Sequence, residues 1–171
     1  MSKPAALPIA SAVLRILIVL NWLMGAAILA LLLIIPNEWW IVAVFKMSPS
    51  PDADRLIMGL HAVAALGLIG TPLNYVVLSR LLAIVLTVRA GDPFVPANAS
   101  RLQGIAWALL GLQVLSVIIG SISNSVSSPA HPVHLDAGFS ISGWLAVILT
   151  FLLARVFAEG AHMRDDLAGT V

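Results

Sequence analysis

Three residues near the middle of one loop have side chains that commonly bind metals. His131, His134 and Asp136 lie within six residues of one another, and Zn²⁺ accepts both imidazole nitrogens and carboxylate oxygens as ligands. Their spacing matches no helical metal motif, Pro132 makes the loop irregular, and the chain has no second motif of this kind. We therefore interpret them as ordinary loop residues and keep a metal site, with His61 nearby, as the weaker alternative.

Residues that could carry out catalysis are hard to find. The chain has no cysteine, which excludes thiol catalysis, thiolate metal sites and disulfides. Its serines cluster in loops, and the segment Gly120-Ser-Ile-Ser123 is not the Gly-x-Ser-x-Gly motif of serine hydrolases. No glycine-rich phosphate loop is present either. The sequence therefore predicts a protein that is not an enzyme and needs no cofactor.

Three uncharged polar residues lie inside long apolar runs: Asn21, Asn74 and Gln113. Such residues usually face other helices and form hydrogen bonds across them, each contributing about 0.6 kcal/mol. Proton pumps and active transporters tend to have ionisable groups in the middle of the membrane. Here no Asp, Glu, Lys or Arg lies deep in an apolar run, since Arg15 is close enough to an end to reach water. This pattern favours a packing role and argues against active transport.

The elements that carry these residues are predicted by an unusual composition. Of the 171 residues, 60% are apolar and only 10% are charged, whereas soluble domains are about 45–50% apolar and about 25% charged. So few charges could not cover the apolar surface of a soluble fold, so lipid is the expected solvent. The net charge of +1 gives no indication of direct binding to nucleic acid.

Four apolar stretches are long enough, or nearly so, to cross a membrane. A transmembrane helix needs about 20 residues to span roughly 30 Å of hydrocarbon. The first stretch is too long for a signal peptide and runs into Pro36 without a cleavage site. We therefore predict an all-α fold, a four-helix transmembrane bundle forming one domain over residues 1–171. Its expected spans are residues 12–35, 56–78, 102–122 and 139–157. Recurrent small residues would let the helices pack closely, and a homodimer interface is a second use for them.

The distribution of Lys and Arg predicts the orientation. Positively charged residues are enriched in cytoplasmic loops. One set of segments holds seven of them and the opposite set holds two, Lys46 and Arg55. The seven are Lys3, Arg15, Arg80, Arg89, Arg101, Arg155 and Arg164. We expect both termini in the cytoplasm of a bacterial cell, with the protein in the inner membrane.

Two of the predicted helices continue beyond the lipid. No helix-breaking residue stops the second helix until Gly91-Asp-Pro93, and Pro51–Ala90 would measure about 60 Å as a helix, twice the hydrocarbon thickness. The fourth helix keeps a helical pattern to Leu167. We call residues 80–101 and 155–171 the platform, and we expect its two parts to touch, with Phe94 near Phe157.

Charges of both signs occur along the platform. Segments that capture anionic lipid usually carry only Lys and Arg, but here Asp92, Glu159, Asp165 and Asp166 alternate with arginines. Mixed charges beside apolar side chains suit pairing between helices, either within this chain or with a protein partner. From sequence alone, both of these uses stay open.

Two segments of the platform resemble a known family. Arg89-Ala-Gly-Asp-Pro-Phe-Val-Pro-Ala-Asn-Ala-Ser-Arg-Leu102 and Leu153–Val171, with its Thr-Val ending, are similar to the bacterial membrane family called domain of unknown function 2975. The resemblance covers roughly residues 78–171, and the four-span architecture agrees over the whole chain. Val95 is a departure, since many members have Thr or a similar residue there that can cap the next helix.

The resemblance implies a function through a partner. Members are often encoded beside a small cytoplasmic helix-turn-helix protein similar to Cro-type repressors, so the resemblance implies a membrane protein that holds or releases such a regulator. The alternative function is a small-molecule or metal sensor, or a transport accessory protein, that uses the bundle interior and the loop histidines. For the regulator, the candidate binding residues are Arg89, Asp92, Pro93, Phe94, Asn98, Arg101, Leu102, Phe157, Glu159, Gly160, Arg164, Leu167 and Thr170.

Overall fold

Four long helices make up nearly all of the described structure. The computed structural model describes residues 6–34, 51–127 and 137–168. The helices are α1 (Ala6–Ile34), α3 (Pro51–Arg89), α4 (Pro96–Val126) and α5 (Ile141–Ala168), and the described part of the chain has no β-strand. All four are long and apolar enough to cross a membrane. The all-α, four-span prediction is therefore confirmed.

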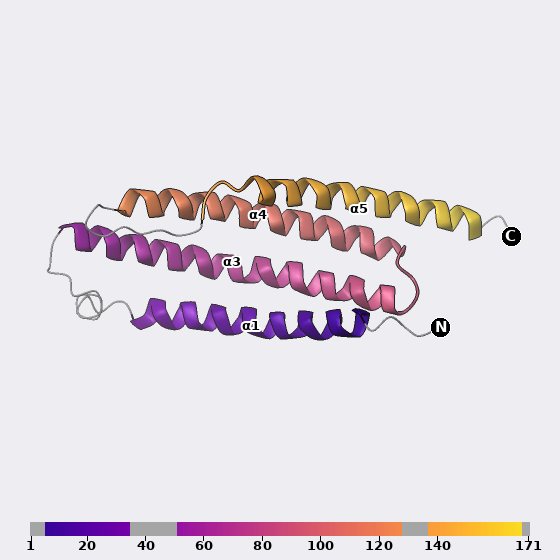
Figure 1. Ribbon diagram of the computed structural model, residues 1–171, viewed down its shortest axis with the longest axis horizontal. Coiled ribbons are helices and arrows are strands. Elements are labelled where there is room, and N and C mark those ends of the chain that lie inside the picture. Colours follow the sequence, from indigo (N-terminus) through magenta and orange to yellow (C-terminus); the bar gives the residue numbers. More distant parts are fainter. Residues whose placement is uncertain (1–5, 35–50, 128–136, 169–171) are drawn as a thin grey trace.

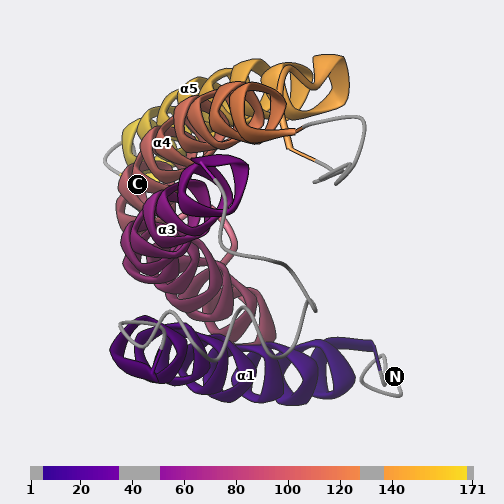
Figure 2. The same cartoon turned by 90° about the vertical axis from the view of Figure 1, so that its left-hand side faces the viewer.

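Each helix packs along the next one in the sequence. α1 lies against α3, α3 against α4, and α4 against α5 (Figure 1). Seen along the helices, the bundle is an open, curved layer with α1 and α5 at its two edges (Figure 2). Lipid tails are as apolar as the side chains, so there is no hydrophobic gain from closing such a layer into a ring. The exposed Leu, Ile and Val side chains along α1 agree with a lipid-facing edge helix.

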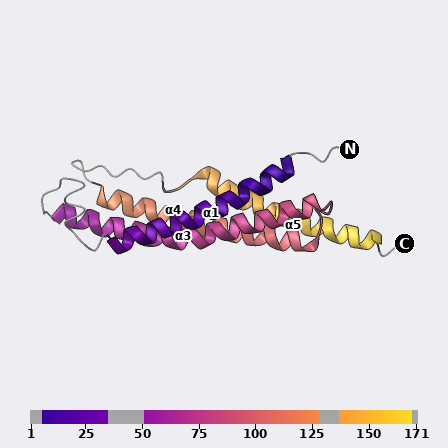
Figure 3. The same ribbon diagram turned by 90° about the horizontal axis from the view of Figure 1, so that it is seen from below.

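The helix lengths exceed the membrane thickness. α3 has 39 residues, which corresponds to about 58 Å, and Pro72 lies inside it without ending it. The predicted continuous helix from Pro51 is thus confirmed. The start of α1, the turn between α3 and α4, and the end of α5 all lie at one end of the molecule (Figures 1 and 3). We call this the platform end. Which side of the membrane it faces stays a prediction.

Small residues allow close packing between the helices. A Cβ atom added to Gly25 of α1 would lie 2.7 Å from Cγ2 of Thr71 in α3. One turn away, Nδ2 of Asn21 donates a hydrogen bond of 3.1 Å to the Thr71 carbonyl oxygen. The predicted role of Asn21, a hydrogen bond across helices, is therefore confirmed, and it fixes α1 against the middle of α3.

The other two intramembrane polar residues differ from each other. Nε2 of Gln113 in α4 donates to the carbonyl oxygen of Ser140, just before α5, at 3.4 Å. Asn74 is exposed and makes no hydrogen bond to another described residue. Our prediction of a cross-helix hydrogen bond thus holds for Gln113, whereas Asn74 lines a groove between α3 and α4 without such a bond.

Candidate docking platform at one end of the helices

The turn between α3 and α4 is built by backbone hydrogen bonds that need a glycine. The N–H of Gly91 donates to the Val88 carbonyl and that of Asp92 to the Thr87 carbonyl, both at 3.1 Å. This pair of bonds is the Schellman helix ending, which requires a left-handed residue. Gly91 supplies it with a φ of 92°, and a side chain there would be strained. Pro93 then prevents the helix from continuing.

The start of α4 has no side-chain cap. Val95 occupies the N-cap position with extended backbone, and its side chain accepts no hydrogen bond. This is the consequence expected from having Val where a Thr could cap. Pro96 follows at the first helical position, where its missing N–H costs nothing. The N–H of Asn98 bonds to the Val95 carbonyl at 2.8 Å, so the start of this helix is held from within the turn.

Asn98 is the centre of the turn. Its side chain is fully buried. Nδ2 donates to the Pro93 carbonyl and to Oγ1 of Thr87, each at 2.8 Å. The Thr87 hydroxyl has one proton, and the 2.7 Å contact with the Ile84 carbonyl indicates that it goes there. Oδ1 of Asn98 accepts from Nη1 of Arg101 at 2.8 Å. One side chain thereby connects the end of α3, the turn and the first turns of α4.

This burial limits what Asn98 can do for a partner. The sequence suggested Asn98 as a candidate binding residue, but its side chain has no exposed surface in this arrangement. Arg101 is half-buried and spends one of its N–H groups on Asn98. Both residues therefore shape the platform from inside. Thr87, which the sequence analysis did not single out, is the third member of this network.

Phe94 forms the apolar part of the platform surface. Its ring lies against that of Phe157 in α5, with centroids 5.3 Å apart. Gly160, one turn further along α5, leaves room for it, since a Cβ there would come within 3.1 Å of Cδ1 of Phe94. The predicted contact between Phe94 and Phe157 is confirmed. Phe94 still keeps 44% of its surface exposed, which is unusual for an aromatic ring at an expected water-facing end.

An ion pair lies beside this aromatic contact. Nη1 of Arg164 in α5 bonds to Oδ1 of Asp92 in the turn, and both side chains are partly exposed. Glu159 is exposed as well, whereas Pro93 and Leu102 are half-buried. Leu167 lies in α5, but its side chain falls outside the description, and Thr170 lies outside the described residues. The charged candidates Asp92 and Arg164 therefore meet each other and remain accessible.

The two parts of the platform touch in a way that differs from our expectation. We expected the extension of the second helix to meet that of the fourth. Instead α4 lies between α3 and α5, and the turn residues Asp92 and Phe94 make the contact with α5. The reason is that α4 starts immediately after a tight turn and so occupies the space beside α3. Arg89, at the end of α3, points toward α1, with Nη1 3.5 Å from Oγ of Ser11.

Most of the candidate metal residues lie outside the part of the chain that the structure describes. His131, His134 and Asp136 lie outside the described residues. Among the residues that are described, no group of three His, Asp, Glu or Cys side chains could hold a metal. Nδ1 of His61 lies 2.8 Å from the Ile57 carbonyl oxygen one turn earlier in α3, a local contact. The alternative of a metal or ligand sensor thus gains no support from the described part.

Comparison with known proteins gives the family. A family model described as "Protein of unknown function (DUF2975)" matches residues 27–171, most of the chain. The chain belongs to this family, and the resemblance noted for the two platform segments is confirmed. No curated protein matches the chain, and no solved structure matches it either.

Proposed function

We propose that this membrane protein is a docking site for a small cytosolic helix-turn-helix regulator. The family has no known function, so the proposal rests on the chemistry of the platform. The docking surface is the exposed edge of Phe94, flanked by Asp92 and Arg164. A regulator held there is unavailable to its promoters. The genes that it controls then respond to the amount or state of the membrane protein.

The observation that carries this proposal is the exposed, supported ring of Phe94. Binding hot spots are enriched in aromatic residues and arginine, surrounded by polar contacts. Phe157 and Gly160 hold the ring in one place, so little conformational freedom is lost when a partner covers it. Asp92 and Arg164 beside the ring carry charges of both signs. This suits a protein partner better than a partner whose surface is purely acidic.

The experiment is copurification from membranes solubilised in mild detergent, with the proposed regulator co-expressed. Phe94→Ala should reduce the recovered regulator at least about tenfold, since loss of a hot-spot side chain costs 2 kcal/mol or more. The matched control is Phe139→Ala, which removes another exposed ring, 73% exposed and stacked on Trp144, that lies just before α5 and away from the platform end. The control should recover as much regulator as the wild type.

A charge exchange separates recognition from folding. Arg164→Glu breaks the ion pair with Asp92, and Asp92→Arg added to it restores a pair of reversed polarity. If the partner reads these charges, the double variant stays unable to bind while its melting temperature recovers. If binding returns together with stability, the ion pair serves only the fold. Equal recovery of regulator by wild type and Phe94→Ala contradicts the proposal.

A further inference from the structure

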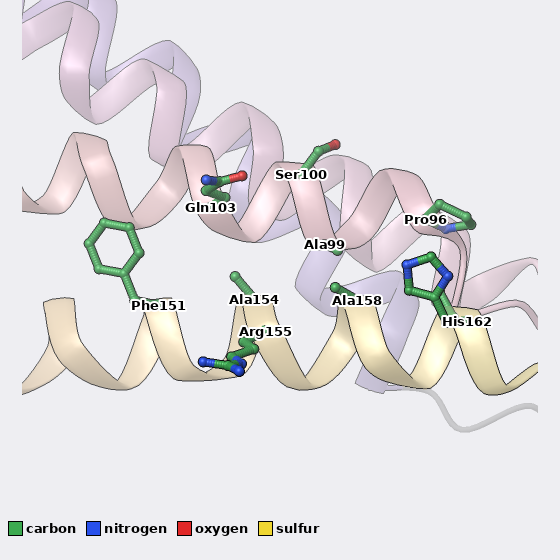
Figure 4. Close-up of a pocket in the computed structure, with 10 residues that line it drawn as sticks. Pro96, Ala99, Ser100, Gln103, Phe151, Ala154, Arg155, Ala158 and His162 are labelled. Atoms are coloured by element: carbon green, nitrogen blue, oxygen red, sulfur yellow. The ribbon is translucent and has the colours of Figure 1, made fainter.

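Two grooves flank the first half of α4 and overlap along the helix at Ser100 and Gln103. The first, of about 430 Å³, lies between α4 and α5. Ser100 and Gln103 line it from α4, and Phe151, Arg155 and His162 line it from α5 (Figure 4). Small alanines on both helices keep the groove open. It is separate from the exposed edge of Phe94, which does not line it.

The second groove adjoins the first. It has about 460 Å³ and lies between α3 and α4, with Arg80 on the α3 side and Trp107 on the α4 side. Ser100 and Gln103 line this groove too, so one stripe of α4 separates two spaces that each contain one arginine. The two grooves can therefore be covered by a single elongated ligand.

The position of Arg80 depends on a glycine. Its guanidinium lies directly over Gly104, in space that a Cβ atom would fill. From there Nη1 donates to the Ser100 carbonyl oxygen at 3.3 Å. A guanidinium has five N–H groups, and the others have no hydrogen-bond partner among the described residues. Arg80 is thus fixed beside the shared stripe with donors to spare.

The charges around the grooves are of one sign. Arg80 and Arg155 line them and no carboxylate does, and the imidazole of His162 adds a further polar group. Asp92 is engaged by Arg164. Glu159, one turn beyond Arg155 in α5, is exposed and lies outside both linings. Of the platform acids whose side chains are described, Asp92 thus pairs with Arg164 and Glu159 is exposed, and neither lines a groove that holds Arg80 or Arg155.

With α4 centred in the bilayer, the grooves would lie at the depth of lipid headgroups. α4 has 31 residues, about 46 Å, so a centred position leaves about 8 Å beyond the roughly 30 Å of hydrocarbon at each end. Ser100 lies about 6 Å from the first residue of α4, close to this boundary. Trp107, about 10 Å deeper, packs edge-to-face on Phe151, with centroids 5.3 Å apart. Its ring is 59% exposed, an apolar wall where acyl chains run.

We infer that the adjoining grooves bind an anionic phospholipid. Its phosphate lies over the stripe of Ser100 and Gln103, between the guanidinium groups of Arg80 and Arg155. Its acyl chains follow Trp107 and Phe151. Arginine guanidinium groups suit phosphate oxygens in geometry and charge, and basic pockets between transmembrane helices are known lipid headgroup sites. A free phosphate ion would make no use of the apolar walls. The inference does not depend on the docking of a regulator.

The test uses the full-length protein in neutral detergent, with lipids added and counted by native mass spectrometry. Phosphatidylglycerol should bind and raise the melting temperature, and phosphatidylcholine should do neither. Arg80→Gln/Arg155→Gln should weaken phosphatidylglycerol binding at least about tenfold, given the contribution of each cation near anionic lipid. Arg15→Gln/Arg55→Gln removes the same charge elsewhere and should bind as the wild type does.

A second measurement remains informative if the double variant is unstable. A protein whose only tryptophan is Trp107 is placed in bilayer discs of mixed phosphatidylglycerol and phosphatidylcholine, and the acyl chains of one lipid at a time carry bromine. The fluorescence of Trp107 should be quenched more when phosphatidylglycerol carries the bromine. Equal quenching by both brominated lipids overturns the inference. So does unchanged binding by the Arg80/Arg155 variant. Equal stabilisation by inorganic phosphate alone overturns it as well, since the site then recognises a free anion.

Discussion

At the scale of single residues, the platform shows which properties a sequence can and cannot reveal. The contact between Phe94 and Phe157 was predictable, because two apolar segments at one end need cover. The burial of Asn98 was not. Its neighbours Thr87 and Pro93 are set by the register of the turn, which a pattern of residue types does not contain. A residue that belongs to a family motif can therefore stabilise the platform from inside without contacting a partner.

The role of Asn98 predicts a large effect for its replacement. Asn98→Ala leaves the Pro93 carbonyl, the Thr87 hydroxyl and Arg101 without this partner, and unsatisfied buried groups cost about 1–3 kcal/mol. Asn98→Asp should also destabilise, because a carboxylate cannot donate to Pro93. Thermal unfolding in detergent measures both. Asn124→Ala, an exposed position near the other end of α4, is the control, and a drop no larger than the control's would contradict this role.

At the scale of elements, prolines and glycines in the sequence predicted helix bounds. The sequence did not predict which helices contact each other. Pro51 and the Gly91–Pro93 turn predicted where α3 begins and ends, and the structure agrees. Apolar runs, however, are hydrophobic on all sides in a membrane, so they do not reveal which face meets a neighbour. The position of α4 between α3 and α5 follows from the short turn and the small residues at the contacts.

Two glycines of the bundle should respond differently to the same substitution. A Cβ on Gly120 would lie 2.7 Å from the Ala137 carbonyl oxygen and the Gly138 Cα atom, and backbone cannot rotate away. Gly120→Ala should therefore destabilise by about 1–3 kcal/mol. At Gly70 the nearest atom, Cδ2 of Leu112, is 3.8 Å away. Gly70→Ala should be neutral or stabilising, because Ala favours helix by about 1 kcal/mol. Equal melting temperatures for the two variants would contradict this account of the α4 packing.

At the scale of the whole molecule, composition predicted the solvent and the number of spans, and the structure confirms four candidate membrane helices. With four spans, the start of α1 and the end of α5 must share a side, as they do in Figure 1. The open, curved layer was not predictable, because composition determines that helices cross the membrane but not whether the layer closes. The five arginines of α3–α5 beyond Arg55 lie toward the platform end, which favours a cytoplasmic position for it.

Reporter fusions test this orientation. A reporter that is active only in the cytoplasm should work after Val171 and in the turn between α3 and α4. One that is active only in the periplasm should work in the loops near Pro49 and Pro129. The physical reason is the distribution of Lys and Arg, seven against two. Periplasmic activity after Val171 would reverse the topology and place the platform outside the cell.

The most direct test of the central claim is photo-crosslinking from position 94 in intact cells. A photoreactive phenylalanine analogue replaces Phe94 in one strain and Phe139, an exposed ring away from the platform end, in another. The proposed helix-turn-helix regulator carries an epitope tag in both. We expect a crosslink to the tagged regulator from position 94 and none from position 139. A regulator that is expressed but crosslinks from neither position, or equally from both, would contradict the claim that the platform is its docking site.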